Sequence, residues 1–152
     1  MIDLYGLPTD FPGKLDRVRD PRNPRLYCDA LERALGDDIG DDHFVPHLQL
    51  HEYETLLFSD PDAFAYSFDT CANAIVGLWQ IVAEFHQDIE RINDGEQTSP
   101  SKRIIELIKA YEGSKPTAGP DIAGYIGLPT LRQKCPHFSD WIRRLENLGE
   151  VS

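Results

Sequence analysis

Acidic side chains in two distant parts of the sequence form the first candidate site. Asp3 lies near the start, and Glu52 and Glu54 lie in the stretch "HEYE", to which Asp10 could add a further carboxylate. Carboxylates that come together repel one another unless a divalent cation neutralises them, so such a cluster commonly holds Mg²⁺ or Mn²⁺. A cation held in this way supports phosphoryl transfer. The alternative is that "HEYE" begins a helix, where acids complement the helix dipole and do no chemistry.

The stretch "INDGEQTSPSKRI" forms the second candidate site. It places Lys102 at the start of an expected helix, whose backbone N–H groups favour an anion such as phosphate. Lys102 could then contribute a point charge to a phosphate that is being cleaved. The alternative is a turn followed by a capped helix, which explains the Asp-Gly and Ser-Pro pairs without any ligand.

Histidines and cysteines offer weaker signals. His43, His47 and His51 would share one face of a regular strand. The outer two would then lie about 26 Å apart, so we do not expect one zinc ion to bind all three. The cysteines form no C-x-x-C pair, and the sequence contains no phosphate-binding loop, dinucleotide fingerprint or nucleophile elbow. Trp79 and Trp141 lie on apolar stripes with helical spacing, which predicts core positions.

The elements that must position these side chains can be read from periodicity and turn residues. Residues 2–5 are typical of the end of a short strand. Asn23 as cap, Pro24 at the first helical position and a helical apolar stripe predict a helix that Gly36 ends. "HFVPHLQLH" then alternates with the period of a strand, and its proline favours an edge position or an irregular start.

The rest of the chain is predicted to be helical, with Pro61, Pro100, Pro120 and Pro129 each at or just before the start of a helix. The fold class is therefore α/β: a partial parallel sheet in residues 1–58 and a mostly helical extension in residues 59–152, together forming a single domain. If the first helix connects two parallel strands, the carboxyl ends of both strands collect the candidate acids at one edge, where ligands bind in open α/β sheets.

Composition and charge limit the function classes. The net charge of −11 argues against holding nucleic acid by phosphate neutralisation alone. No apolar run approaches the roughly 18 residues that a membrane span requires, so we expect no membrane association. A basic, signal-like start is absent, and the three cysteines are odd in number and widely spaced. This pattern predicts reduced thiols in the cytoplasm.

Four ordered motifs carry a resemblance to a known family: "DLYGLPTDFPG", "LQLHEYETLLFSDPDAF", "INDGEQTSPSKRI" and "CPHFSDWIRRLENL". Together they resemble an uncharacterised bacterial family of Toprim-type proteins associated with ATPases, which is related to the AriB effector of the PARIS anti-phage system and to OLD-type nucleases. The resemblance implies a Toprim-like α/β unit that binds magnesium and cuts nucleic-acid strands. By that resemblance Asp3 would hold the cation, Glu52 and Glu54 would complete the metal site, and Lys102 would face the phosphate.

The sequence departs from the family pattern at its start. Members usually begin with a further strand and a turn reading approximately V-E-G-x-T-E, whose glutamate is a metal ligand and proposed general base. This sequence has no such segment, so we expect it to be the C-terminal portion of a Toprim-like protein, truncated before its central strand. A sheet without that strand would expose an edge, which predicts a homodimer or a partner chain.

The leading hypothesis is a metal-dependent nuclease that cleaves phosphodiester bonds of DNA or RNA, with an ATPase partner and a role in phage defence implied by the resemblance alone. Without the missing glutamate, we expect the fragment by itself to be inactive. The competing hypothesis is a protein-interaction module that docks on the ATPase partner and does no chemistry. A third is an RNA-binding loop formed by the basic residues between positions 14 and 25.

Overall fold

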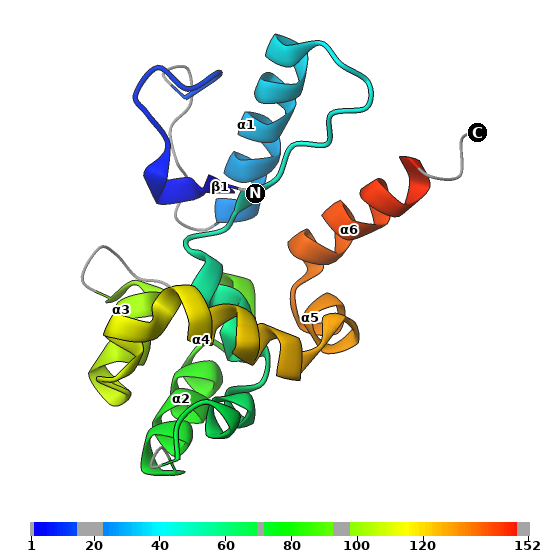
Figure 1. The fold of residues 1–152 in the computed structure, drawn as a ribbon. Helices are drawn as coiled ribbons and strands as arrows, with labels where there is room; N and C mark the ends of the chain where they lie inside the picture. The colour runs from blue at the N-terminus through cyan, green and yellow to red at the C-terminus, as the bar shows by residue number, and fades with distance from the viewer. Residues whose placement is uncertain (1, 15–22, 70–71, 93–97, 149–152) are drawn as a thin grey trace. The chain divides into compact units, whose positions relative to one another are not determined.

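The computed structural model describes residues 2–14, 23–69, 72–92 and 98–148 of the chain (Figure 1). Its strands and α-helices are, in chain order, β1 (Ile2–Asp3), α1 (Pro24–Ile39), β2 (Leu48–Gln49), α2 (Ala72–Glu84), α3 (Pro100–Leu107), α4 (Tyr111–Ile126), α5 (Leu128–Lys134) and α6 (Pro136–Leu148). Short 3-10 helices lie between them: η1 (Leu4–Gly6), η2 (Tyr53–Ser59), η3 (Pro61–Tyr66) and η4 (Ile89–Arg91).

The chain divides into two compact units. The first unit consists of residues 1–50 together with residues 137–152, and the second consists of residues 51–136. These units do not coincide with the predicted sheet part and helical part, because the last helix belongs to the first unit. That residues 1–152 form a single domain stays a prediction.

The first unit contains the parallel strand pair that the sequence predicts. β1 pairs with β2 in parallel, with Ile2 opposite Leu48 and Asp3 opposite Gln49. α1 lies between the two strands in the chain, so the pair is a strand–helix–strand unit and the α/β class is confirmed in this form. The predicted strand over residues 43–51 is wrong in length, since only Leu48 and Gln49 pair. Pro46 has no N–H to donate to a ladder, so the segment before it stays irregular.

α1 begins where predicted but ends later. The Asn23 side chain accepts a hydrogen bond from the N–H of Leu26 at 3.3 Å, and Pro24 occupies the first turn. The predicted end at Gly36 is wrong, because the helix continues to Ile39. Gly40 then adopts the left-handed conformation, with φ of 65°, and its N–H donates to the Gly36 carbonyl at 2.9 Å. The left-handed cap, rather than the first glycine in the sequence, ends the helix.

The core of the first unit joins the inner face of α1 to β2, to η1 and to the proline-rich loop that follows η1. Leu7 and Phe11 from that loop are buried, and the ammonium group of Lys14 donates to the Leu7 carbonyl at 2.6 Å. The buried apolar residues of this core are Leu4, Leu7, Phe11, Cys28, Leu31, Leu48 and Leu50. The described part of this loop, up to Lys14, therefore packs into the core of the unit.

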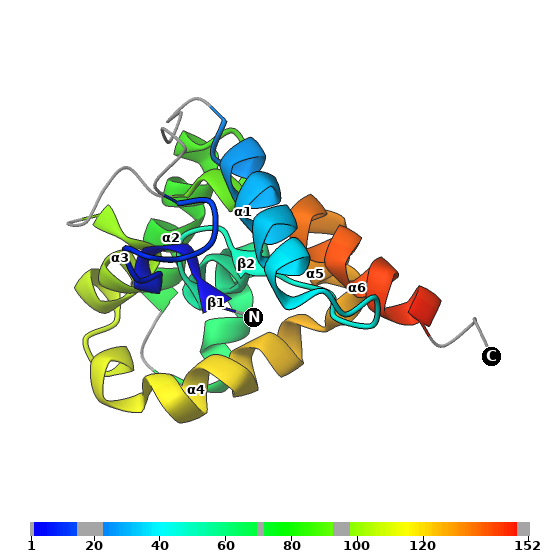
Figure 2. The ribbon, with the colours of Figure 1, turned by 90° about the horizontal axis from the view of Figure 1, so that it is seen from above.

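The second unit is helical, as predicted, although its boundaries differ in two places. "EYETLLF" forms the 3-10 helix η2 in place of the expected helical segment, and α4 runs through Pro120, where a new helix was expected to start. Asp60 caps η3, since its side chain accepts from the N–H of Asp62 at 3.1 Å. Figure 2 shows the unit from above, with α4 as its longest helix.

Among the described residues, no helix combines the length and the apolar character needed to cross a bilayer.

Two glycines of α1 provide a matched test of how this helix ends. We expect Gly40→Ala to lower the free energy of unfolding by about 1 kcal/mol, because a Cβ is strained in the left-handed conformation. Gly36→Ala is expected to be neutral or to stabilise by up to about 1 kcal/mol. A Cβ at position 36 would make only ordinary contact with Pro46, at 3.7 Å. Urea unfolding of both variants measures the difference, and equal effects would contradict the assigned helix end.

Candidate metal centre

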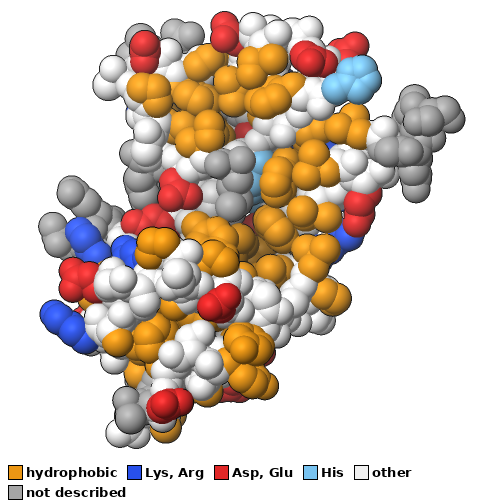
Figure 3. Space-filling model, in the orientation of Figure 1, with side chains coloured by type: hydrophobic (Ala, Val, Ile, Leu, Met, Phe, Trp, Pro, Cys, Tyr) orange, Lys and Arg blue, Asp and Glu red, His pale blue; other side chains and the backbone are white. Residues whose placement is uncertain are grey.

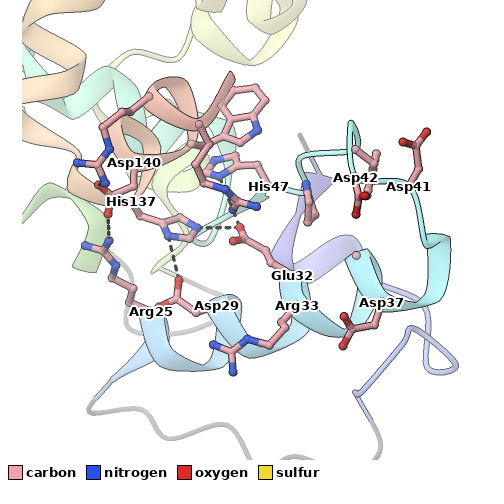
Figure 4. A pocket seen from close by; sticks show the side chains of 16 residues that line it. Arg25, Asp29, Glu32, Arg33, Asp37, Asp41, Asp42, His47, His137 and Asp140 are labelled. Atoms are coloured by element: carbon pink, nitrogen blue, oxygen red, sulfur yellow. Dashed lines mark hydrogen bonds and ion pairs between the residues drawn. The ribbon is translucent and has the colours of Figure 1, made fainter. Parts of the chain in front are cut away.

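Three buried side chains of the first unit form a cluster that could hold a metal ion. They are Glu32 from α1, His47 from the segment just before β2, and His137 from the first turn of α6. One ligand atom from each lies within 4.8 Å of the others. Figure 4 shows the Glu32 carboxylate beside the two imidazole rings, with a dashed line to each. The cluster thus offers two nitrogens and one oxygen to a cation.

Local structure explains how the three side chains converge. Cys28, Leu31 and Glu32 are all buried, so they lie on the inward face of α1 at helical spacing. The backbone carbonyl of His47 accepts from the N–H of Ile2 at 3.2 Å, which fixes its segment against β1. His137 follows Pro136 at the start of α6. The cluster therefore joins helix, sheet and C-terminal helix of one unit.

The Glu32 carboxylate is the centre of the cluster. Its Oε1 accepts a hydrogen bond from the backbone N–H of Leu48 at 2.7 Å. The same oxygen lies 3.0 Å from Nε2 of His137 and 3.5 Å from Nδ1 of His47. Nε2 of His137 also lies 3.2 Å from the Leu48 carbonyl. Both imidazoles therefore direct a nitrogen at one carboxylate oxygen.

The outer nitrogen of each histidine has a partner of its own. Nδ1 of His137 lies 3.4 Å from a carboxylate oxygen of Asp29, and Nε2 of His47 lies 3.5 Å from the amide oxygen of Gln49. The His47 ring is also stacked between two others, with centroids 4.8 Å from His137 and 4.7 Å from Trp141. Trp141 itself donates to the Val45 carbonyl at 3.1 Å. These contacts fix the orientation of both rings.

Burial keeps His47 neutral. Removal from water lowers the pKa of His47 to about 4, and the nearby His137 lowers it further, while the Glu32 carboxylate opposes the shift. Near neutral pH the ring is therefore an uncharged imidazole, which is the form that binds metals. Its Nδ1 is buried and makes no hydrogen bond. A buried polar atom without a hydrogen bond calls for a physical reason.

A cavity of about 650 Å³ opens beside the cluster. Its walls come from α1, from the loop that follows α1 and from α6, and they carry both acidic and basic side chains (Figure 4). Arg25 and Asp140 form an ion pair across it. Acidic side chains gather over the end of α1 and the loop after it, as Figure 3 shows. Glu32, His47 and His137 all line this cavity.

The residues predicted from the sequence lie in both units. Asp3 is half-buried at the carboxyl end of β1 in the first unit, whereas Glu52, Glu54 and Lys102 belong to the second. The strand end expected for Asp3 is confirmed. That the three acids meet around one Mg²⁺ or Mn²⁺ ion stays a prediction.

Within the second unit, Glu52 and Glu54 have partners of their own. Glu52 accepts from the N–H of Ser101 at 2.8 Å, at the start of α3, so a side chain of the protein already binds the helix N-terminus that was predicted to bind phosphate. Lys102 is exposed on the same turn. Glu54 accepts from the Tyr111 hydroxyl at 3.4 Å. Burial raises the pKa of Tyr111 and the Glu54 carboxylate adds to the rise.

The sequence reasoning missed Glu32 and His137, and it considered His47 only with the wrong partners. A glutamate at position 32 interrupts the apolar face of α1, directly after the buried Leu31. This single acidic residue among apolar positions of the predicted helix could have indicated a site, because a buried carboxylate needs a partner. The partner itself could not be identified without the fold.

Comparison with known protein families gives a match over most of the chain. The family model described as "Domain of unknown function (DUF4276)" matches residues 1–146, a range that contains all three residues of the cluster. No curated protein and no solved structure matches the chain. The relationship to Toprim, AriB and OLD proteins stays a prediction.

The low pKa of His47 predicts how stability depends on pH. In the metal-free protein, the pKa of His47 is 6.5 in the unfolded chain and about 4 in the folded chain, so the unfolded chain binds the proton at a higher pH. The free energy of unfolding should therefore be constant above about pH 7 and fall by about 3 kcal/mol as pH decreases from 6.5 to 4. Urea unfolding with EDTA present measures this slope.

The matched variants separate His47 from other titrating groups. His47→Phe keeps a ring for stacking and removes the titration, so its slope over the same range should be shallower than that of the wild type. The exposed His43, changed to Gln, should leave the slope unchanged. Equal slopes for wild type and His47→Phe would contradict the neutral, buried state of His47.

Proposed function

The chain belongs to the DUF4276 family, and from its own side chains we propose that it is a metal-dependent hydrolase with one divalent transition-metal ion between Glu32, His47 and His137. The observation that carries this proposal is the Nδ1 atom of His47. This nitrogen is buried, makes no hydrogen bond and faces the Glu32 carboxylate at 3.5 Å. A cation between the two atoms would satisfy both.

The chemistry of the three ligands favours a particular group of metals. Imidazole nitrogens suit Zn²⁺, Fe²⁺, Cu²⁺ and Ni²⁺, whereas Mg²⁺ prefers oxygen ligands and retains several waters. We therefore propose a first-row transition metal at this site, of which only Mn²⁺ was among the ions expected from the sequence. Three protein ligands leave a coordination position open, as in catalytic zinc sites.

The reaction class follows from the open position and the cavity. A cation held by Glu32, His47 and His137 would supply an activated water for hydrolysis. The cavity beside the cluster would admit the substrate, and Arg33 and Arg144, which line it, could pair with an anionic group. We propose a phosphodiester of DNA or RNA as the substrate, in keeping with the family resemblance.

A second arrangement for the same reaction uses the acids predicted from the sequence. Asp3 ends one strand of a parallel pair, where the resemblance to Toprim proteins places a magnesium ligand. In this arrangement Glu52 and Glu54 would complete a site for Mg²⁺ or Mn²⁺ and Lys102 would face the phosphate. An ATPase partner, a homodimer and a role in phage defence would accompany it, and all three stay predictions.

The non-catalytic alternative, a docking module, has one observation in its favour. Tyr66 and Tyr125 stack on each other at the surface of the second unit, with ring centroids 4.2 Å apart. The exposed fraction is 70% for Tyr66 and 57% for Tyr125. Exposed aromatic rings are common at protein interfaces. This surface needs no metal, so metal binding separates the alternative from a hydrolase.

Metal titration tests the site directly. We expect EDTA-treated protein to bind Co²⁺ or Zn²⁺ at one equivalent, with d–d absorption of Co²⁺ reporting two nitrogen ligands and one oxygen ligand. Glu32→Gln and His47→Phe should each weaken binding by about 100-fold or more, since each removes one of three ligands. The exposed Glu106, changed to Gln, is the matched control and should bind as the wild type does. Saturable binding that survives both ligand variants would contradict the site.

Cleavage assays distinguish the two catalytic arrangements. With DNA and tRNA as substrates and Mn²⁺ as the metal, we expect activity that His47→Phe reduces at least 100-fold and that Asp3→Asn leaves within a few-fold of wild type. Circular dichroism checks that both variants fold. Full activity in His47→Phe together with loss in Asp3→Asn would overturn the proposal and favour the acidic site.

A further inference from the structure

Two residues outside the three ligands control how the histidines are presented. Resting on the proposed metal site, we propose that Gln49 and Asp29 are positioning residues that assign one nitrogen of each ring to the metal: Nδ1 of His47 and Nε2 of His137. Their roles follow from the hydrogen-bonding capacity of each group.

Gln49 determines which nitrogen of His47 carries the proton. The side chain is buried, and its amide nitrogen donates to the Leu50 carbonyl at 3.3 Å. That bond leaves the amide oxygen to face Nε2 of His47 at 3.5 Å. A carbonyl oxygen only accepts, and Nδ1 makes no hydrogen bond although Glu32 lies at the same distance, so the geometry places the proton of the neutral ring on Nε2. Nδ1 is therefore left with a lone pair.

The lone pair of Nδ1 points at another acceptor. Nδ1 of His47 and Oε1 of Glu32 face each other at 3.5 Å, with the side chains of both residues almost fully buried. Two acceptors with no proton between them repel in an interior without water. Two ligands of one tetrahedral ion, each about 2.1 Å from the metal, lie about 3.4 Å apart. The pair thus has the spacing of ligands around a shared cation.

Asp29 plays the corresponding part for His137. Its carboxylate lies 3.4 Å from Nδ1 of His137 and pairs with the N–H of that nitrogen. Nε2 faces two acceptors, Oε1 of Glu32 at 3.0 Å and the Leu48 carbonyl at 3.2 Å, so in the metal-free protein it carries a proton that a bound cation would replace (Figure 4). Metal-binding histidines commonly donate their second N–H to a carboxylate, which fixes the ring and increases its basicity. Asp29 and Glu32 are three residues apart on α1, so one helix face supplies both a ligand and the residue that orients another.

The short strand pair supports this arrangement. Gln49 lies opposite Asp3 in the β1–β2 register, and His47 and Gln49 are two residues apart in an extended segment, so their side chains point the same way. A slip of one residue in the register would turn Gln49 away from the ring. The two-residue sheet therefore determines the tautomer of His47.

The experiment combines a tautomer measurement with a metal titration. Long-range ¹H–¹⁵N spectra of the metal-free protein identify which nitrogen of His47 is protonated, a property that a merely structural role of Gln49 would not set. Gln49→Met removes the acceptor while keeping the size of the side chain. Gln49→Glu keeps an acceptor and serves as the rescue variant. Gln80→Met, at an exposed position on α2, is the matched control.

We expect wild type and Gln49→Glu to show the Nε2–H tautomer of His47, and Gln49→Met to show a mixture with about 10- to 100-fold weaker Co²⁺ binding. Asp29→Ala should weaken Co²⁺ binding by a similar factor. Asp37→Ala, at an exposed position two turns further along α1 on the same cavity, should not weaken it.

The outcomes separate this inference from the metal site itself. If the wild type binds Co²⁺ and Gln49→Met binds it equally with an unchanged tautomer, the positioning role is overturned while the metal site stands. If the wild type binds no Co²⁺, the metal site fails first, and the positioning roles fail with it.

Discussion

The buried carboxylate of Glu32 is the constraint on which the first unit depends. Taking an ionised carboxylate out of water costs several kcal/mol unless its oxygens are paired. Here the backbone N–H of Leu48 and the ring of His137 meet that need. Because these groups belong to β2 and α6, satisfying one side chain of α1 connects three segments that are far apart in the chain. The positions of His47 and Trp141 follow from this connection, since their rings stack beside His137.

Local signals predicted the elements of the fold better than their lengths. The asparagine cap, the following proline and the apolar stripe were sufficient to predict the start of α1, and the order strand, helix, strand predicted the parallel pair. The lengths depended on interactions that no local pattern contains. β2 is short because Pro46 precedes it, and α1 passes Gly36 because the left-handed conformation that ends it is adopted at Gly40. Each error concerns where an element begins or ends.

The candidate site was harder to predict than the fold. Its ligands are 15 and 90 residues apart, at positions 32, 47 and 137, so their convergence depends on the return of the last helix to the first unit. The histidines near position 47 were judged as members of one regular strand, and on that geometry zinc was not expected. The irregular backbone around Pro46 removes the premise of that argument. His47 instead meets a glutamate and a histidine that the strand pattern could not reveal.

A purely structural network would account for Glu32 and His137 but not for His47. The carboxylate already has a backbone donor and an imidazole, so a further imidazole adds no hydrogen bond to it. An apolar ring of the same shape would fill the space between His137 and Trp141 without a buried lone pair, and such replacements are often neutral or stabilising. The presence of a neutral, oriented imidazole at this position is therefore costly for stability alone. It becomes favourable when a cation takes both His47 Nδ1 and Glu32 Oε1 as ligands, which is why we assign the cluster to metal binding.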